Sequence, residues 1–138
     1  MPAKDLFHEA VKNALIKDGW TITDDPLSIK VGGMDFYIDL GAEKLIGAEK
    51  EGRKIAIEIK GFTSLSQTYE FHLAVGQFVN YRVALEEKEP DRVLYLAVPS
   101  DTYKDFFKLD FVKTVIEKQH LKLIICNVKK EEVTKWQE

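Results

Sequence analysis

Alternating apolar and polar side chains near the middle of the chain, in the run RKIAIEIKG, place the strongest constraint on the fold. Isoleucine occupies every second position, at Ile55, Ile57 and Ile59. Between and after them lie the charged residues Glu58 and Lys60. Successive side chains of a β-strand point to opposite faces of its sheet, so this period of two indicates a strand. We expect it to bury the isoleucines on one face and to present Glu58 with Lys60 on the other.

The other segments predict one mixed α/β domain that spans residues 1–138. Apolar residues recur at helical spacing in three segments, which are 4–18, 67–88 and 101–119. Strand-like runs lie between them, at 20–25, 43–49, 53–61, 92–99 and 121–128, and residues 36–40 are extended. The predicted order is therefore helix, three strands, helix, strand, helix and strand, around a mixed sheet.

Turns and the tail complete this prediction. The glycine pair Gly32-Gly33 indicates a turn, and the residues 50–52 indicate a hairpin between two antiparallel strands. The later strand–helix–strand segments favour a parallel pair. The charged tail over 128–138 is expected to fray or to form a short helix.

Composition excludes several classes of protein. One cysteine, Cys126, excludes an internal disulfide framework and a zinc site built from cysteines. No apolar run approaches the ~20 residues of a membrane span, and the polar start MPAKDLFHEA lacks the pattern of a secretory signal. We expect a cytoplasmic protein without a membrane partner. The net charge of −3 argues against a protein that coats nucleic acid, but it does not exclude a nuclease, whose metal site needs carboxylates.

Asp39 and Glu58 are the candidate metal ligands. They lie nineteen positions apart, on segments that can pair as adjacent strands. Mg²⁺ takes carboxylate oxygens together with waters and substrate phosphate, and Mn²⁺ prefers the same oxygen ligands. Such an ion can activate a water and stabilise charge on a phosphate. Lys60 shares a face with Glu58 and can hold the attacking water or neutralise developing charge.

Three other carboxylates compete with Asp39 as the first ligand. Asp35 lies four residues before it, and Glu43 and Glu49 belong to the following predicted strand. A shift of one residue in strand register would bring a different side chain to the metal-binding face. We prefer Asp39 because its two apolar neighbours should bury and fix it.

The pattern Asp39…Glu58-x-Lys60, with helices and strands in this order, resembles the PD-(D/E)xK nuclease superfamily of restriction endonucleases, Holliday-junction resolvases and RecB-type nucleases. The second predicted helix carries QFVNY, from Gln77 to Tyr81, which matches the Q-x-x-x-Y motif of RecB-like members. Positions i and i+4 share one helix face. The resemblance implies a restriction-endonuclease-like αβββαβ core, with a mixed central sheet flanked by helices. It also implies that the glutamine and tyrosine position the lysine or a phosphate.

The same resemblance implies the remaining roles. Asp39 and Glu58 bind Mg²⁺ or Mn²⁺, and the backbone carbonyl of Ile59 is a further oxygen ligand. His8, in the first predicted helix, stands where related nucleases carry a histidine or glutamate that supports the metal. Lys60 orients or activates water. The implied reaction is hydrolysis of phosphodiester bonds in DNA.

A narrower resemblance covers residues 1 to about 128. The stretches FHEAVKNALIKDGW, IDLGAEKLIGAEKEGRKIAIEIKGF and AVGQFVNYR occur in that order. They resemble the XisH family, the fdxN-element excision controlling factors of cyanobacteria. This family is associated with site-specific DNA excision during cell differentiation and occurs beside a small partner protein, XisI. The resemblance implies a controlling factor for DNA rearrangement.

Two other functions stay open from the sequence. The fold could serve a non-catalytic regulator that binds DNA or protein and acts through an XisI-like partner. The acidic net charge and the small size favour that reading. Alternatively, the polar strand face could bind no metal and be purely structural. A chain of 138 residues offers little surface for reading a DNA sequence, so we expect a homo-oligomer or a partner protein in either case.

Overall fold

The computed structural model describes residues 3–45 and 52–138 of the chain. Within these ranges one large mixed sheet has the strand order β1-β4-β5-β6-β7-β8, and a separate small sheet pairs β2 with β3. The strands of the large sheet are β1 (Thr21–Asp24), β4 (Leu40–Leu45), β5 (Gly52–Ile59), β6 (Arg92–Pro99), β7 (Leu123–Asn127) and β8 (Glu132–Gln137). The small sheet consists of β2 (Leu27–Val31) and β3 (Met34–Ile38).

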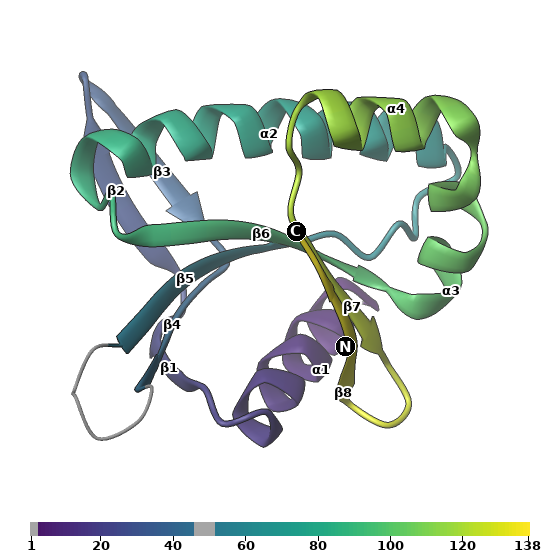
Figure 1. Cartoon of the computed structure of the whole chain (residues 1–138), viewed down its shortest axis with the longest axis horizontal. Helices are drawn as coiled ribbons and strands as arrows, with labels where there is room; N and C mark the ends of the chain where they lie inside the picture. Colours follow the sequence, from purple (N-terminus) through teal and green to yellow (C-terminus); the bar gives the residue numbers. More distant parts are fainter. Residues whose placement is uncertain (1–2, 46–51) are drawn as a thin grey trace.

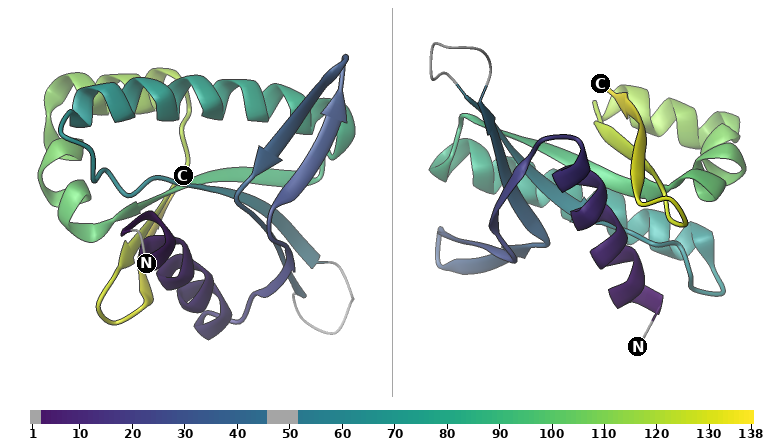
Figure 2. Two further views of the ribbon diagram at one scale, coloured as in Figure 1. Left: turned by 180° about the vertical axis from the view of Figure 1, so that it is seen from behind. Right: turned by 90° about the horizontal axis from the view of Figure 1, so that it is seen from below.

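Helices cover both faces of the large sheet (Figure 1). The helix α1 (Ala3–Lys17) lies on one face, and α2 (Gln67–Lys88) lies with α4 (Asp110–Lys118) on the other. The short helix α3 (Ser100–Lys104) and the 3₁₀ turn η2 (Phe106–Lys108) connect β6 to α4. The two views of Figure 2 show the β2–β3 hairpin standing against α2, on the side of the molecule away from β8.

The strand pairing follows the sequence prediction. The β4–β5 pair is antiparallel, as a hairpin requires, and the crossover pairs β5–β6 and β6–β7 are parallel. The predicted hairpin connection over 50–52 lies outside the described residues, except for Gly52, at which β5 begins. The central strand β5 therefore has an antiparallel neighbour on one edge and a parallel neighbour on the other.

The three isoleucines of β5 share one face of the sheet, as predicted, and the structure has a core on both faces. Ile55, Ile57 and Ile59 are buried on the α1 face, in a cluster with Phe7 and Val11 of that helix. The opposite core lies between the sheet, α2, α4 and the β2–β3 hairpin. Its largest side chains are the aromatic residues Phe62, Phe71, Phe78, Phe106 and Phe107. Burial of apolar area on both faces is the main stabilising contribution to the fold.

Two of the three predicted helices agree with the structure, and the third is wrong. The predicted helix over 101–119 is broken at Asp105 and Leu109, whose backbones are not helical. Between the two breaks, Phe106 and Phe107 form the short 3₁₀ turn η2 and are both buried in the core. The break at both ends of η2 allows this burial, and it leaves Phe111 of α4 71% exposed.

The prediction for the tail is also wrong. The residues 132–137 form the edge strand β8, antiparallel to β7, and not a frayed end or a helix. Trp136 anchors this strand, because its ring lies 5.7 Å from Trp20 and 5.1 Å from Tyr95, measured between ring centroids. The charged composition of this segment did not indicate a strand. The contacts of Trp136 and the backbone pairing with β7 stabilise it.

The first half of the β2–β3 hairpin was not predicted as a strand. Leu27 and Ile29 are buried and Ser28 and Lys30 are exposed, so the period of two is present but short. The predicted turn is confirmed at Gly32 and Gly33, which have φ of +56° and +83°. Glycine adopts positive φ without steric cost, which suits a tight hairpin turn.

No helix in the ranges 3–45 and 52–138 is long and apolar enough to cross a membrane.

We predict that Trp136→Ala lowers the free energy of unfolding by about 2 kcal/mol, since it removes a partly buried aromatic ring from its contacts with Trp20 and Tyr95. Urea unfolding followed by circular dichroism measures this loss. Lys129→Ala, a change at an exposed position in the preceding turn, is the control and should stay within about 0.5 kcal/mol of wild type. Equal stability of the two variants would contradict a structural role for β8.

Candidate functional site

The candidate site lies where the β4–β5 ladder ends. The last pair of that ladder is Leu40 with Ile57, and one further step of the same register sets Asp39 opposite Glu58. Before Leu40 the chain has left the large sheet, because β3 pairs with β2. Directly opposed residues on antiparallel strands point to the same face. The fork between the two sheets therefore brings the two predicted carboxylates together.

The side chain of Asp39 accepts a backbone hydrogen bond from β5 at the point where pairing with β4 has ended. The backbone N–H of Ile59 donates a 2.8 Å hydrogen bond to Asp39 Oδ2. The next N–H, of Lys60, donates instead to the Ala97 carbonyl of β6 at 3.0 Å. Alternate residues of a strand pair with opposite neighbours, so the N–H and C=O of Ile59 both point to the Asp39 side. The carbonyl of Ile59, which was predicted as a metal ligand, therefore points to the edge of β5 on which Asp39 lies.

Glu58 is a buried carboxylate with incomplete charge compensation. Its residue is 5% exposed, and the Lys60 ammonium lies 3.7 Å from its Oε2 atom. The Asp39 backbone N–H donates a long hydrogen bond of 3.4 Å to its Oε1 atom. Burial, together with the negative charge of Asp39, raises the pKa of Glu58 to about 8, and Lys60 opposes this rise without cancelling it. Two close carboxylates of this kind are suited to a bound cation.

The helix α2 contributes Tyr81 near the carboxylates, and Gln77 lies one helical turn before it. Burial, together with the negative charges of Glu58 and Asp39, raises the pKa of Tyr81 to about 12, so its hydroxyl lies within the influence of both carboxylates. The Tyr81 ring packs edge-on against Phe36 of β3, with centroids 5.9 Å apart. One helical turn earlier, Gln77 Oε1 is buried and accepts no hydrogen bond from any described residue. An unpaired buried amide oxygen is costly, so this acceptor is available to a ligand or a water.

His8 does not join this group in the structure. Its Nε2 atom lies 2.9 Å from Asp25 Oδ1, and Lys12 Nζ binds the other oxygen of the same carboxylate at 2.8 Å. The pKa of Asp25 is lowered: burial acts to raise it, but the hydrogen bonds and charges of Lys12 and His8 prevail. The first-helix histidine is therefore engaged in a local ion-pair cluster, and a metal-supporting role would require it to leave Asp25.

The rivals of Asp39 lie elsewhere on the strands. Asp35 sits near the tip of the β2–β3 hairpin, where its carboxylate is 4.0 Å from Lys30 Nζ. Glu43 lies opposite Lys54 on the β4–β5 ladder, at 3.9 Å. Glu49 lies outside the described residues. Asp39 is the rival that the observed register brings beside Glu58.

The donor set has the composition that a hard divalent cation requires. Within the described parts of the chain, no group of three or more His, Cys, Asp or Glu side chains gathers at one point. Asp39, Glu58 and the Ile59 carbonyl are all oxygen donors, and Mg²⁺ commonly uses one or two carboxylates and keeps several waters. The unpaired oxygen of Gln77 also fits a site that is completed by water or a phosphate-bound group.

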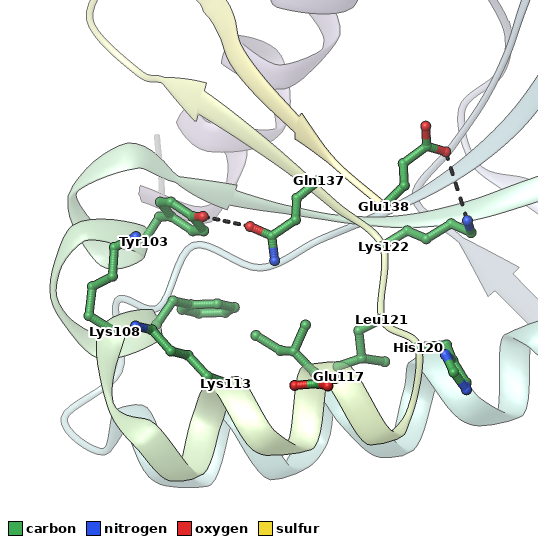
Figure 3. A pocket seen from close by; sticks show the side chains of 11 residues that line it. Tyr103, Lys108, Lys113, Glu117, His120, Leu121, Lys122, Gln137 and Glu138 are labelled. Carbon is green, nitrogen blue, oxygen red and sulfur yellow. Dashed lines mark hydrogen bonds and ion pairs between the residues drawn. The ribbon is translucent and has the colours of Figure 1, made fainter.

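A cavity away from the carboxylates is a separate feature that the sequence did not predict. It has a volume of about 500 Å³ and lies between α3, α4 and the end of β8 (Figure 3). Lys108, Lys113 and Lys122 line it together with Glu117 and Glu138, so its charges largely cancel. None of the carboxylate-site residues lines this cavity. Most of its residues come from the broken helix and the tail, the two segments for which the prediction was wrong, and the others belong to the segment 120–122.

The fold and the site define a class of protein: a mixed-sheet α/β domain with paired carboxylates and a lysine at the fork of an antiparallel ladder. The model of the family described as "XisH protein" matches residues 1–134. This chain therefore belongs to the XisH family, as its sequence motifs predicted.

Two solved structures resemble the chain over nearly its whole length. An XisH family protein from Nostoc punctiforme PCC 73102 has 50% identity and a TM-score of 0.90, over 97% of this chain and 100% of its own. An fdxN element excision controlling factor from Anabaena variabilis has 51% identity and a TM-score of 0.88, over 97% of this chain and 99% of its own. None of the curated proteins matches the chain.

The raised pKa of Glu58 predicts a pH-dependent stability. Below its ordinary value of 4.5 the carboxyl is protonated in both the folded and the unfolded protein, so the shift has no effect there. As the pH rises toward about 8, the unfolded chain releases this proton first and folding stability falls. Each unit of difference corresponds to about 1.4 kcal/mol.

Glu58→Gln should lose this dependence. We expect its free energy of unfolding, relative to wild type, to rise by a few kcal/mol between pH 5 and pH 9, measured by urea unfolding without divalent ions. Saturating Mg²⁺ should stabilise wild type at pH 8 and leave the variant unchanged. Parallel pH profiles of the two proteins would show that Glu58 is not held in this environment.

Proposed function

We propose that this chain binds Mg²⁺ or Mn²⁺ between Asp39 and Glu58 and hydrolyses phosphodiester bonds in DNA, as a member of the PD-(D/E)xK superfamily. The observation that carries the proposal is the register of β4 and β5, which sets the two carboxylates opposite each other with Lys60 beside them. The raised pKa of Glu58 supports it, because excess negative charge in a buried site favours a bound cation.

The residues of the site have distinct proposed roles. Asp39, Glu58 and the Ile59 carbonyl would hold the ion, which when bound supplies positive charge to a phosphate and lowers the pKa of a water. Lys60 would bind the attacking water or a phosphate oxygen once its contact with Glu58 is relaxed by the ion. Gln77 would use its unpaired buried oxygen to orient Lys60 or the water.

The link to DNA comes from the family. The relative from Anabaena variabilis is described as an fdxN element excision controlling factor. We propose that this chain likewise controls a site-specific DNA excision, and that strand cleavage at the carboxylate site is its contribution. We further propose that it works with a small XisI-like partner protein, since one chain of this size offers little surface for sequence recognition.

A specific observation favours a second candidate, a non-catalytic regulator that uses the nuclease fold to bind DNA or protein. The site is partly satisfied without a metal, since Asp39 accepts the Ile59 N–H and Lys60 lies close to Glu58. A domain that had lost cleavage could keep these contacts for stability. The two candidates differ in whether DNA is cut, not in whether the carboxylates are paired.

Cleavage of supercoiled and branched DNA tests the proposal. We expect nicking in Mg²⁺ or Mn²⁺ that is abolished by chelation and lowered at least about 100-fold by Asp39→Asn, Glu58→Gln or Lys60→Met. Glu43→Gln is the matched control, since this carboxylate lies on the same ladder but is paired with Lys54. It should cleave as wild type does.

Direct metal titration separates the two candidates. Calorimetry with Mn²⁺ should show one site that Asp39→Asn and Glu58→Gln weaken and that Lys60→Met retains. A folded protein that binds Mn²⁺ at this site but cuts no DNA, alone or with an XisI-like partner, would make the chain a non-catalytic regulator. Cleavage that survives Glu58→Gln would place the active site elsewhere.

The helix residues provide a finer test of the same site. We expect Tyr81→Phe and Gln77→Leu to lower the cleavage rate about 10-fold or more while leaving Mn²⁺ affinity within about twofold, because neither is proposed as a metal ligand. Loss of metal binding in either variant would mean that α2 supports the carboxylates and not the water or the phosphate.

A further inference from the structure

The outer face of α2 carries an exposed strip, and the C-terminal half of this strip borders an open pocket against the β2–β3 hairpin. We call it the α2 seam, and it consists of Tyr69, Leu73, Gly76, Asn80, Val83 and Glu87. Three members are large apolar residues that remain well exposed: Tyr69 at 61%, Leu73 at 42% and Val83 at 55%. Figure 1 shows α2 on the outside of the molecule, with the sheet on its other side. The core-facing residues of α2 form a different face, so the seam is not needed to attach the helix to the sheet.

The spacing of the seam is that of a helix that packs against another helix. Its members are separated alternately by four and three residues, over the whole of α2. This is the a/d pattern of two helices that pack side by side, with knobs of one helix in the holes of the other. A single polar residue, Asn80, occupies one inner position, where such residues commonly fix register.

Gly76 indicates a close approach at the centre of the seam. A glycine inside a helix is destabilising relative to alanine. No heavy atom of the described chain lies within 4 Å of the position that a Cβ atom of Gly76 would occupy, so nothing within the monomer uses the missing side chain. A second helix backbone at this point would use it.

We propose that the α2 seam binds the α2 seam of a second copy of this chain, with the two helices antiparallel. The register that aligns the two seams lies one residue from full overlap of two copies of Gln67–Lys88. It sets Leu73 opposite Val83 of the second copy, and Gly76 opposite the second copy's Asn80. A self-complementary patch of this kind gives a closed two-fold dimer. Because α2 also carries Gln77 and Tyr81, the pairing holds two carboxylate sites in one assembly, yet it does not depend on metal binding or cleavage.

Charge complementarity selects the second copy and the antiparallel direction. The C-terminal half of the strip carries Glu86 and Glu87, whereas the N-terminal half carries His72 and the Tyr69 hydroxyl. All four side chains are exposed. In the antiparallel register Glu86 flanks His72 of the second copy, and Glu87 meets the second copy's Tyr69, so each carboxylate gains a hydrogen-bond donor. Parallel helices would bring Glu87 against its own copy and repel it.

Sedimentation velocity tests the surface. We expect wild type to shift from monomer to dimer as its concentration rises, and Leu73→Glu to weaken this association at least about tenfold, because a carboxylate would be buried in the seam. Phe111→Glu is the matched control, since Phe111 is 71% exposed on α4 and lies outside the seam. Both variants should keep the melting temperature of the wild-type monomer.

Cross-linking with a short bis-maleimide tests the direction. A mixture of His72→Cys and Glu86→Cys proteins should form a cross-linked dimer, and either protein alone should not. In the antiparallel register the two copies of position 72 lie about 18 Å apart along the helices, and the two copies of position 86 about 24 Å apart. The native Cys126 should not interfere, because it is fully buried and burial raises its pKa to about 12.

Three outcomes would overturn the proposal. A wild-type protein that stays monomeric to about 1 mM would assign the seam to another partner. A dimer that Phe111→Glu weakens as much as Leu73→Glu would place the interface elsewhere. Cross-linking of His72→Cys to itself would make the helices parallel.

Discussion

One hydrogen bond, from the Ile59 N–H to the Asp39 carboxylate, marks the point on which the site depends. The antiparallel ladder ends there because the chain before Leu40 belongs to a second small sheet. Without a backbone partner, Ile59 is paired by a side chain, and that side chain is held opposite Glu58. The same fork leaves Glu58 buried beside a second negative charge, with its pKa raised to about 8. A strand end that needs a side-chain partner and a buried carboxylate with a raised pKa thus lie at one place, as is common at functional sites.

The parts of the fold that were predictable are those whose side-chain period is long and regular. The alternation in β5 and the apolar face of α2 extend over many residues, and the structure confirms both. The prediction failed where local composition and tertiary packing disagree. The tail is rich in charge, yet Trp136 and pairing with β7 make it a strand. The segment around Phe106 has helical spacing, yet the helix is interrupted on both sides of the buried Phe106 and Phe107. Such choices depend on contacts distant in sequence, which periodicity does not contain.

Some parts of the candidate site were likewise predictable from the sequence, and others were not. The motif spacing and the strand period predicted Asp39, Glu58 and Lys60 as one group, and the ladder register sets Asp39, and not Asp35, opposite Glu58. The position of His8 was not predictable, because its contact with Asp25 depends on how α1 lies against the loop after β1. The exposed strip on α2 was also not predictable, since the sequence alone does not show which apolar side of a helix packs against the core.

The most direct test of this account is a crystal structure of the protein grown or soaked with Mn²⁺, with the ion located by its anomalous scattering. The account predicts one strong peak within bonding distance of the Asp39 and Glu58 carboxylates and the Ile59 carbonyl, with Lys60 displaced from Glu58. The peak should be absent in Glu58→Gln. A well-ordered structure that holds Mn²⁺ elsewhere, or that leaves these carboxylates without an ion at millimolar Mn²⁺ and neutral pH, would contradict the claim that they form a metal site.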